Sequence, residues 1–232
     1  MPQAIDDAAV THTDSTWMNR HFELVIAMLL GLASIVTAWA SFQASLYDGE
    51  MSAANTRAGV LSAEAESLYL EGNQQYLSDG QLFDRLTELR IQSTSADAAA
   101  AAVAAETIDV LTFQSMSEDF AAAVEWADAE NEADPEMFTH PQGDEAYLAT
   151  LFGEYEQVKA QADTELANSS KFNDLGDQLT LNTVLLAISL FLFGIAAILR
   201  TYRTRLLITG VSAVVMVVAT VLTFIVVSTP IS

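Results

Sequence analysis

The chain has 232 residues and a formal net charge of −22, with 31 acidic residues against nine basic ones. A surface of this sign repels nucleic acid, so nucleic-acid binding is not an expected activity. The sequence contains no Cys, which excludes disulfides, thiol chemistry and Cys-ligated metal sites. An external domain of this chain must therefore be held together by helix packing.

The first apolar run, residues 23–43, carries no charge beyond its first residue and predicts a transmembrane helix. Residues 1–22 precede it and include Arg20, which favours a cytoplasmic N-terminal segment. The small residues Ala38 and Ala40 have the spacing of a signal-peptide cleavage site, so a cleaved signal peptide is the alternative. The long, acidic segment ahead of the run favours a retained anchor.

Residues 44–180 form the predicted extracytoplasmic domain and hold nearly all of the charge. They contain 27 acidic and five basic residues, whereas the rest of the chain is balanced. Only two residues of the whole chain are Lys, and Ala is abundant. This composition resembles that of proteins from salt-loving prokaryotes, whose carboxylate-dense surfaces stay hydrated in concentrated salt. Salt adaptation is the simpler explanation, and specific cation binding is the alternative.

Helical periodicity dominates this domain. A seam of small and apolar residues follows the first span and predicts that its helix continues to about Ser78, with a break at Asp79-Gly80. Asp97 is the predicted N-cap of an Ala-rich helix that reaches about Asn131, and Asp144 caps a last helix that continues toward the second span. The seam consists of Met51, Ala54, Ala58, Leu61, Ala65 and Leu68, at heptad spacing.

A hairpin of two further spans closes the chain. Residues 181–199 and 206–228 are apolar and uncharged, and the turn 200–205 lies between them. Its basic residues are Arg200, Arg203 and Arg205. Short Arg-rich loops stay in the cytoplasm, so residues 44–180 and the tail 229–232 are expected on the outer side.

The predicted fold is therefore all-α, with three transmembrane helices plus an extracytoplasmic antiparallel helical bundle. The predicted location is the cell membrane, crossed several times, with a cytoplasmic N-terminus. None of the spans has an ionisable residue in its middle, which disfavours proton-coupled transport and voltage sensing.

Two spans carry stripes of small and hydroxylated residues. Such residues let helices approach closely and hydrogen-bond, or line a narrow pore formed by several subunits. Packing is the commoner use, and both interpretations place protein against one side of these helices. The stripes are Ala27, Gly31, Ser34, Thr37, Ser41 and Ser45 in the first span, and Thr209, Ser212, Met216, Thr220 and Thr223 in the third.

No catalytic motif is present, so neither enzymatic activity nor a cofactor is expected. The best candidate for a metal site is the acidic loop around His140, because carboxylates and one imidazole can coordinate Ca²⁺ or Zn²⁺. Without EF-hand spacing, a solvated acidic loop is the simpler explanation. The candidate ligands are Asp134, Glu136, His140, Asp144 and Glu145.

Two stretches carry a resemblance to known proteins: Val25–Asp48 (VIAMLLGLASIVTAWASFQASLYD) and Leu186–Gly210, together about a fifth of the chain. In their order of elements they resemble uncharacterised prokaryotic three-span membrane proteins, grouped as a domain of unknown function. In that group an N-terminal span is followed by a long helical segment and a closing hairpin with a basic turn. The resemblance implies a shared topology and carries no functional residue.

Three functions remain open. The leading hypothesis is a non-enzymatic integral membrane scaffold or accessory subunit, whose helical ectodomain binds itself or a partner membrane protein. The first alternative is an oligomeric ion channel whose acidic ectodomain concentrates cations. The second is an extracytoplasmic sensor subunit that needs a separate output partner. The expected partners are membrane lipid, a second copy or another membrane protein, and cations at the ectodomain.

Overall fold

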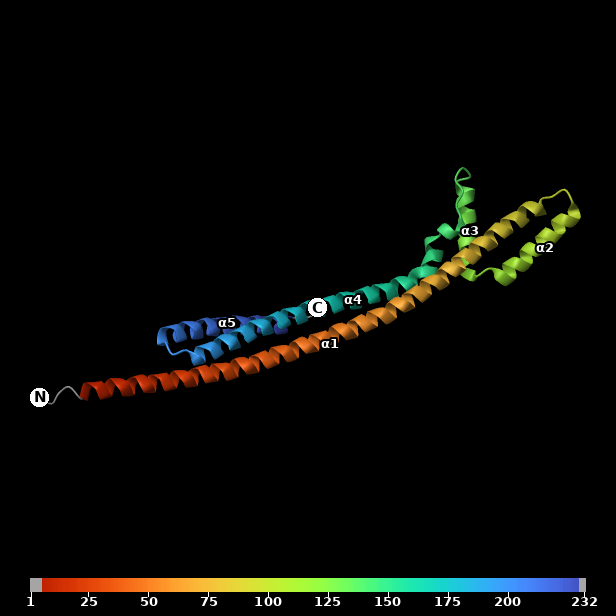
Figure 1. Ribbon diagram of the computed structural model, residues 1–232. Helices are drawn as coiled ribbons and strands as arrows, with labels where there is room; N and C mark the ends of the chain where they lie inside the picture. Colours follow the sequence, from red (N-terminus) through yellow and green to blue (C-terminus); the bar gives the residue numbers. More distant parts are fainter. Residues whose placement is uncertain (1–5, 230–232) are drawn as a thin grey trace. The chain divides into compact units, whose positions relative to one another are not determined.

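The computed structural model describes residues 6–229, with side chains described from His21 onward (Figure 1). Over this range the chain is helical and contains no strand. The elements are α1 (Asp6–Ser93), α2 (Ala98–Ser115), α3 (Glu118–Ala133), the 3₁₀ turn η1 (Pro141–Gly143), α4 (Glu145–Ile198) and α5 (Tyr202–Ser228). The predicted all-α class is therefore confirmed.

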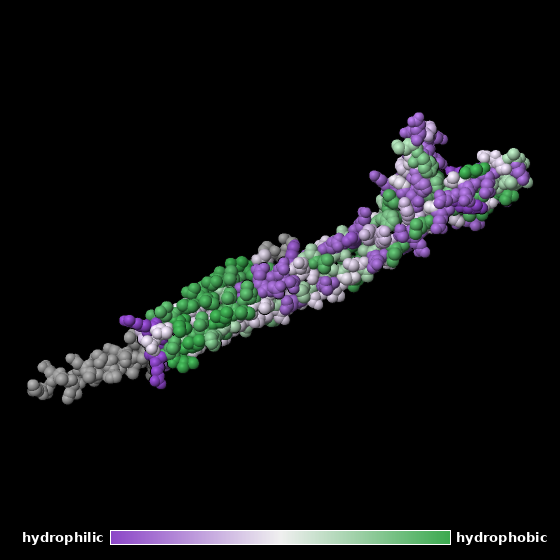
Figure 2. Space-filling model, turned by 45° about the horizontal axis from the view of Figure 1, so that its top comes forward, coloured by the Kyte–Doolittle hydropathy of each residue, from purple (hydrophilic) through white to green (hydrophobic). Residues whose placement is uncertain are grey.

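Three of these helices, α1, α4 and α5, are long and apolar enough to cross a membrane. Apolar residues gather on the outer faces of the same helices, as the hydropathy surface in Figure 2 shows. Met28, Ile35, Phe191 and Val214 are each between 63 % and 69 % exposed. Exposed apolar surface of this extent is stable in lipid rather than in water. The chain therefore has the surface of a membrane protein.

The chain divides into two compact units. The first, the span unit, combines the chain up to Asn55 with the chain from Leu166 onward. The second, the middle unit, comprises Thr56–Glu165.

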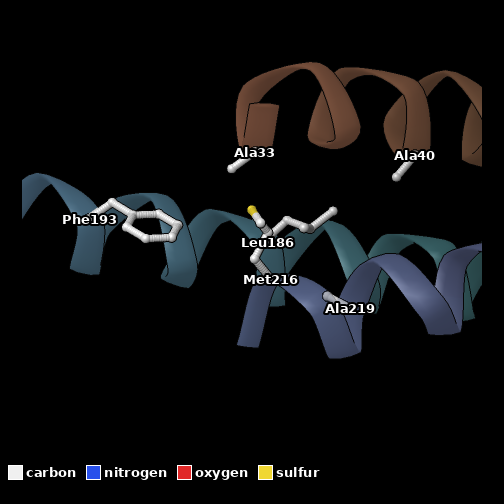
Figure 3. Packing of buried hydrophobic residues seen from close by; sticks show 6 residues of the cluster. All are labelled: Ala33, Ala40, Leu186, Phe193, Met216 and Ala219. Atoms are coloured by element: carbon white, nitrogen blue, oxygen red, sulfur yellow. The ribbon is translucent and has the colours of Figure 1, made fainter. Parts of the chain in front are cut away.

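One buried apolar cluster joins the three helices of the span unit, and Figure 3 shows its side chains meeting between the helices. The cluster consists of Ala33 and Ala40 from α1, Leu186 and Phe193 from α4, and Met216 and Ala219 from α5. The Ser189 hydroxyl donates a hydrogen bond to the Ser212 carbonyl at 2.8 Å, which ties α4 to α5. Interhelical hydrogen bonds of this kind contribute about 0.6 kcal/mol in membranes.

A single repeat of three and four residues describes the buried face of α1. All six residues of the predicted seam, from Met51 to Leu68, are buried or half-buried. The same repeat extends back to Ile26 and forward to Leu89, both of which are buried. Ala predominates on this face, so neighbouring helices can lie close to α1.

The predicted break at Asp79-Gly80 is wrong, because α1 continues without interruption to Ser93. Asp79 occupies a seam position and is 1 % exposed. Its carboxylate accepts a hydrogen bond from the Tyr147 hydroxyl at 2.7 Å and another from Gln75 Nε2 at 2.9 Å. Because these donors replace water, the buried carboxylate does not require the helix to end.

The single helix predicted from Asp97 to about Asn131 is in fact two helices. Asp97 caps α2 as expected, and its carboxylate accepts a hydrogen bond from the Ala99 amide at 3.0 Å. A second cap follows at Ser117, whose hydroxyl accepts a hydrogen bond from the Phe120 amide at 3.2 Å and begins α3. The available signal was Ser117 followed by two acidic residues, which favour a helix N-terminus.

The last helix predicted in residues 44–180 continues into the second span, as predicted, because α4 is unbroken from Glu145 to Ile198. Within it, the Ser169 hydroxyl donates to the Met51 carbonyl of α1 at 3.1 Å. α5 begins at Tyr202, so the turn is shorter than the predicted 200–205, and two of its three Arg residues belong to α5.

Gly72 marks a close approach of α1 to α4 in the middle unit. A Cβ atom built at Gly72 would lie 2.5 Å from the Leu151 carbonyl oxygen and 3.1 Å from a ring carbon of Phe152. A Cβ atom built at Gly59, on the exposed side of the same helix, would meet nothing within 4 Å.

We therefore predict opposite effects for two identical substitutions. Gly72→Ala should lower the stability of the middle unit by about 1–3 kcal/mol, because α1 and α4 must move apart. Gly59→Ala should raise it by about 0.5–1 kcal/mol, because Ala favours the helix. Thermal unfolding of the full chain in detergent, followed by circular dichroism, measures both. Equal changes in the two variants would contradict the close approach.

Candidate functional site

The stripe predicted on the first span takes little part in packing within the chain. The buried positions of α1 along this stripe are Ile26, Ala33, Ala40 and Ala44. The stripe residues Ala27, Gly31, Ser34, Ser41 and Ser45 are exposed, and Thr37 is half-buried. We call this exposed row the first-span stripe. It leaves a face of small and hydroxylated residues open to another molecule.

The stripe predicted on the third span is used inside the span unit. Its residues Thr209, Ser212, Met216 and Thr223 are buried, and Thr220 is half-buried. The hydroxyls of Ser212, Thr220 and Thr223 each donate to the carbonyl four residues earlier in α5. Because these bonds are satisfied within the helix, the hydroxyls can lie against neighbouring helices. Within one chain this stripe is a packing surface.

The carboxylates of the acidic loop make local backbone contacts. Asp134 Oδ1 accepts a hydrogen bond from the Glu136 amide, and Asp144 Oδ1 accepts one from the Ala146 amide, both at 3.1 Å. Among the described residues, no three His, Asp or Glu side chains gather closely enough to hold a metal ion. The five candidate ligands, Asp134, Glu136, His140, Asp144 and Glu145, are therefore not brought together as a metal site.

His140 anchors the loop to α1. Its Nδ1 accepts a hydrogen bond from the Gln142 amide at 3.2 Å. Its ring meets the Phe83 ring edge to face, with centroids 4.8 Å apart. Gln142 in turn donates to the Tyr76 carbonyl of α1. These contacts give His140 a structural role in positioning the loop.

A buried polar pair lies in the core of the middle unit. Tyr147 is 2 % exposed and donates to the Asp79 carboxylate. Burial, followed by the hydrogen bond to Asp79, raises the pKa of Tyr147 above its ordinary value of 10.0. The surrounding residues are Phe120, Ala123 and Val124, with Tyr76, Phe83, Met116 and Leu151 around them. Enclosed by apolar side chains, the pair holds α4 to α1.

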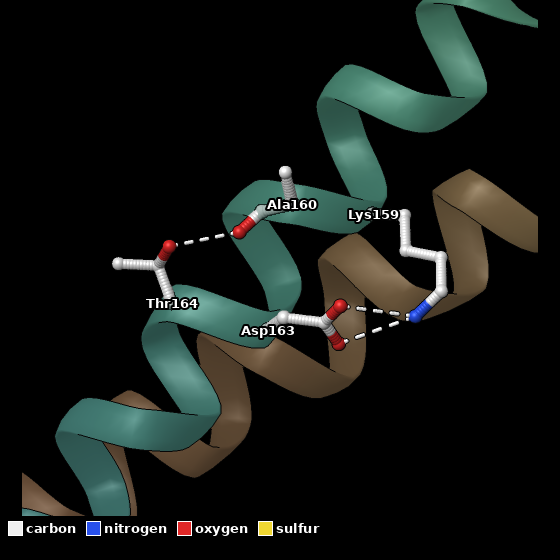
Figure 4. Close-up of polar contacts among 4 residues, drawn as sticks. All are labelled: Lys159, Ala160, Asp163 and Thr164. Atoms are coloured by element: carbon white, nitrogen blue, oxygen red, sulfur yellow. Dashed lines mark hydrogen bonds and ion pairs between the residues drawn. The ribbon is translucent and has the colours of Figure 1, made fainter.

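A shallow groove runs between α1 and α4 in the middle unit. Beside the groove, Lys159 Nζ forms an ion pair with the Asp163 carboxylate at 3.0 Å (Figure 4). The Thr164 hydroxyl donates a hydrogen bond to the Ala160 carbonyl. The hydrogen bond to Asp163 raises the pKa of Lys159 above its ordinary value. Both charged side chains are exposed to water, so the pair contributes little to stability.

The groove is small for a ligand site. Its volume of about 260 Å³ is below the roughly 300–1,000 Å³ that is usual for small-molecule pockets. The ring centroids of Tyr69 and Tyr155, which line the groove, lie 5.3 Å apart. The lining residues are Ser62, Ala65, Glu66, Tyr69, Tyr155, Lys159, Ala162 and Asp163.

The most informative surface of the middle unit is an exposed apolar face of α2. Val103, Val110 and Phe113 are 64 %, 45 % and 91 % exposed. They are separated by seven and three residues, which places them on one side of the helix. Ala104 is the buried residue of α2. We call Val103, Val110 and Phe113 the α2 face.

Sequence reasoning did not single out the α2 face. The available signal was the spacing of these three residues within the Ala-rich run, whose first eight residues, 98–105, carry no charge. A Phe side chain that is 91 % exposed gains nothing from the folding of its own chain. Its exposure beside Val103 and Val110 makes the α2 face a candidate contact surface.

The Arg residues that set the predicted orientation differ in their surroundings. Arg200 and Arg203 are exposed, whereas Arg205 is 5 % exposed and lies over the Phe22 ring, 5.0 Å from its centroid. The side chain of Arg20 lies outside the described part of the chain, as do residues 230–232 of the predicted tail.

No protein-family model, curated protein or solved structure that was compared matches the chain. The resemblance to uncharacterised three-span proteins therefore stays a prediction.

The Asp79–Tyr147 pair predicts a pH-dependent stability of the middle unit. In the unfolded chain Tyr147 loses its proton near pH 10.0, whereas the folded chain retains it. Stability is therefore fully present below pH 10.0 and falls as the pH rises above it, by about 1.4 kcal/mol per pH unit for one proton. Chemical denaturation of the full chain in detergent at about pH 8 and about pH 11 measures this fall.

Tyr147→Phe should remove this dependence. At neutral pH it should lower stability by about 1–3 kcal/mol, because the buried Asp79 carboxylate loses a donor. The difference between the wild-type protein and the variant should shrink as the pH rises above 10.0. Tyr155→Phe, in the same helix, is the matched control and should retain the wild-type slope. A difference that stays constant with pH would contradict the assignment to Tyr147.

Proposed function

We propose that the protein is a non-enzymatic integral membrane scaffold or accessory subunit that binds a partner protein through the α2 face. The observation that carries the proposal is Phe113, which is 91 % exposed beside Val110 on the same side of α2. Interfaces are built around exposed aromatic anchors of this kind, whereas isolated surface Leu or Val residues need no explanation.

The proposed topology places the middle unit outside the cell as an antiparallel helical bundle. Arg200 and Arg203 at the link between α4 and α5 support a cytoplasmic position for that link. The α2 face would then meet the outer domain of another membrane protein. The high negative charge elsewhere on residues 44–180 keeps the rest of this domain from associating nonspecifically, and it attracts cations.

Self-association within the membrane is the second candidate, and the first-span stripe supports it. Small residues on an exposed membrane helix allow a second helix to lie close. A Cβ atom built at Gly31 would meet nothing within 4 Å, so this part of the stripe is open in the single chain. A channel would require such an assembly, because three spans are few for a self-contained pathway, whereas a sensor subunit would need a separate output partner.

Photo-crosslinking in native membranes tests the α2 face. Replacing Phe113 with p-benzoylphenylalanine should give a discrete adduct, and the adduct mass distinguishes a second copy from a different protein. The same replacement at Val60, which is 63 % exposed on α1, is the matched control and should give no discrete adduct. Phe113→Ser should reduce recovery of the complex about tenfold or more, because a buried aromatic anchor is lost. Equal crosslinking at both positions would sink the proposal.

Cysteine crosslinking tests the first-span stripe. The chain has no Cys of its own, so one introduced Cys reports without background. Ser34→Cys should form a disulfide-linked dimer on oxidation in membranes, because the stripe meets a second copy. Val217→Cys, on the outer face of α5 and 55 % exposed, is the control and should stay monomeric. A monomeric Ser34→Cys protein would rule out self-association through this face.

A further inference from the structure

Arg205 is a buried charge with an incomplete set of partners. Its side chain is 7 % exposed, and its Nε and Nη2 atoms have no hydrogen-bond partner among the described residues. Nη1 lies 3.6 Å from Glu23 Oε1, well beyond the roughly 2.7–2.9 Å of a charge-assisted hydrogen bond. A guanidinium group that is buried without a full partner is strongly unfavourable, so a further anionic partner is expected.

The two unpartnered atoms form one edge of the guanidinium group. Nε and Nη2 carry parallel N–H bonds, and this edge binds carboxylate and phosphate oxygens in pairs. The Thr209 hydroxyl lies one turn further along the same face of α5, and it is also buried without a hydrogen-bond partner among the described residues. It adds another donor on the same side of the helix.

Arg205 lies in the first turn of α5, whereas Thr209 lies one turn further from the N-terminus. The Arg205 guanidinium and the Tyr202 ring both contact Phe22. The centroids of the Phe22 and Tyr202 rings lie 5.9 Å apart. Arg205 therefore reaches back to the level of the first residue of α5. Thr201, the N-cap, makes no side-chain hydrogen bond to the first turn. The N–H groups of that turn and the helix dipole favour an anion at this position.

We propose that the N-terminal turn of α5, with Arg205, binds a phosphate-type oxyanion supplied by the headgroup of an anionic phospholipid. The end of an apolar helix lies where lipid headgroups are found, and the exposed Arg200 and Arg203 raise the local positive potential. Tyr202, whose ring contacts that of Phe22, is of a residue type enriched at this depth. The oxyanion pairs with the Nε–Nη2 edge once the guanidinium turns this edge toward the headgroups.

Glu23 competes with the oxyanion for the same guanidinium group. The Glu23 side chain is 65 % exposed, and its carboxylate lies near only Nη1 of Arg205. It can therefore turn into water when a phosphate pairs with Arg205. Removing its charge should therefore strengthen oxyanion binding. This direction is opposite to the effect of any change in Arg205 itself.

The experiment compares the thermal stability of the full chain in nanodiscs of phosphatidylcholine with that in nanodiscs containing phosphatidylglycerol. The wild-type protein should unfold about 3 °C or more higher in the anionic discs. Arg205→Lys keeps the charge but loses the paired N–H edge, and it should abolish the difference. Arg203→Lys makes the same change at an exposed position and should keep most of the difference in unfolding temperature between the two lipids. Glu23→Gln should enlarge it.

Each variant is compared between two lipids, so a change in its basal stability cancels. Two further arms in detergent add inorganic phosphate or acetate at equal ionic strength. An Arg205-dependent rise with phosphate alone would support the site and assign its source to soluble phosphate. The proposal is overturned if acetate gives the same rise, if neither lipid nor phosphate stabilises the protein, or if both Lys variants lose the effect equally.

Discussion

Close approach to α1 along one row of small side chains is the constraint on which the rest of the structure depends. The row includes Ala33, Ala40, Ala54 and Ala65, and it reaches Gly72. In the span unit, the Ala positions admit the larger Leu186 and Phe193 side chains of α4. In the middle unit, the Leu151 carbonyl of α4 lies so close to Gly72 that a methyl group at this position would not fit. In each unit a small residue on α1 lets a helix lie close to it.

Because this row occupies one side of α1, the other sides are free for different tasks. The first-span stripe lies beside the buried row on α1, mostly at exposed positions. The polar Asp79 lies within the buried row. Asp79 is tolerated there because Tyr147 and Gln75 supply donors in place of water. Charge elsewhere in the middle domain stays at the surface, where it is hydrated. The unusual groups are therefore those that the packing leaves without a partner.

Two such groups stand out, and they differ in chemistry. Phe113 is apolar and exposed to water, which is unfavourable until another apolar surface covers it. Arg205 is charged and buried, which is unfavourable while its Nε and Nη2 atoms lack a partner. Neither is explained by contacts within the chain. These two groups are the basis of the proposals that a partner protein and an anionic lipid bind this chain.

The sequence alone determined the helical class and the three apolar spans, because uncharged runs and heptad spacing are local patterns that need no knowledge of the fold. It also located the caps at Asp97 and Asp144, where a side chain bonds to backbone close by. Tertiary structure decided which stripe is buried, since the first and third spans carry similar residues but face different surroundings. It also carried α1 past Asp79, because the compensating donor, Tyr147, lies 68 residues away in the chain. The contacts of Arg205 with Phe22 and Glu23 likewise come from another helix, so no local pattern could reveal them.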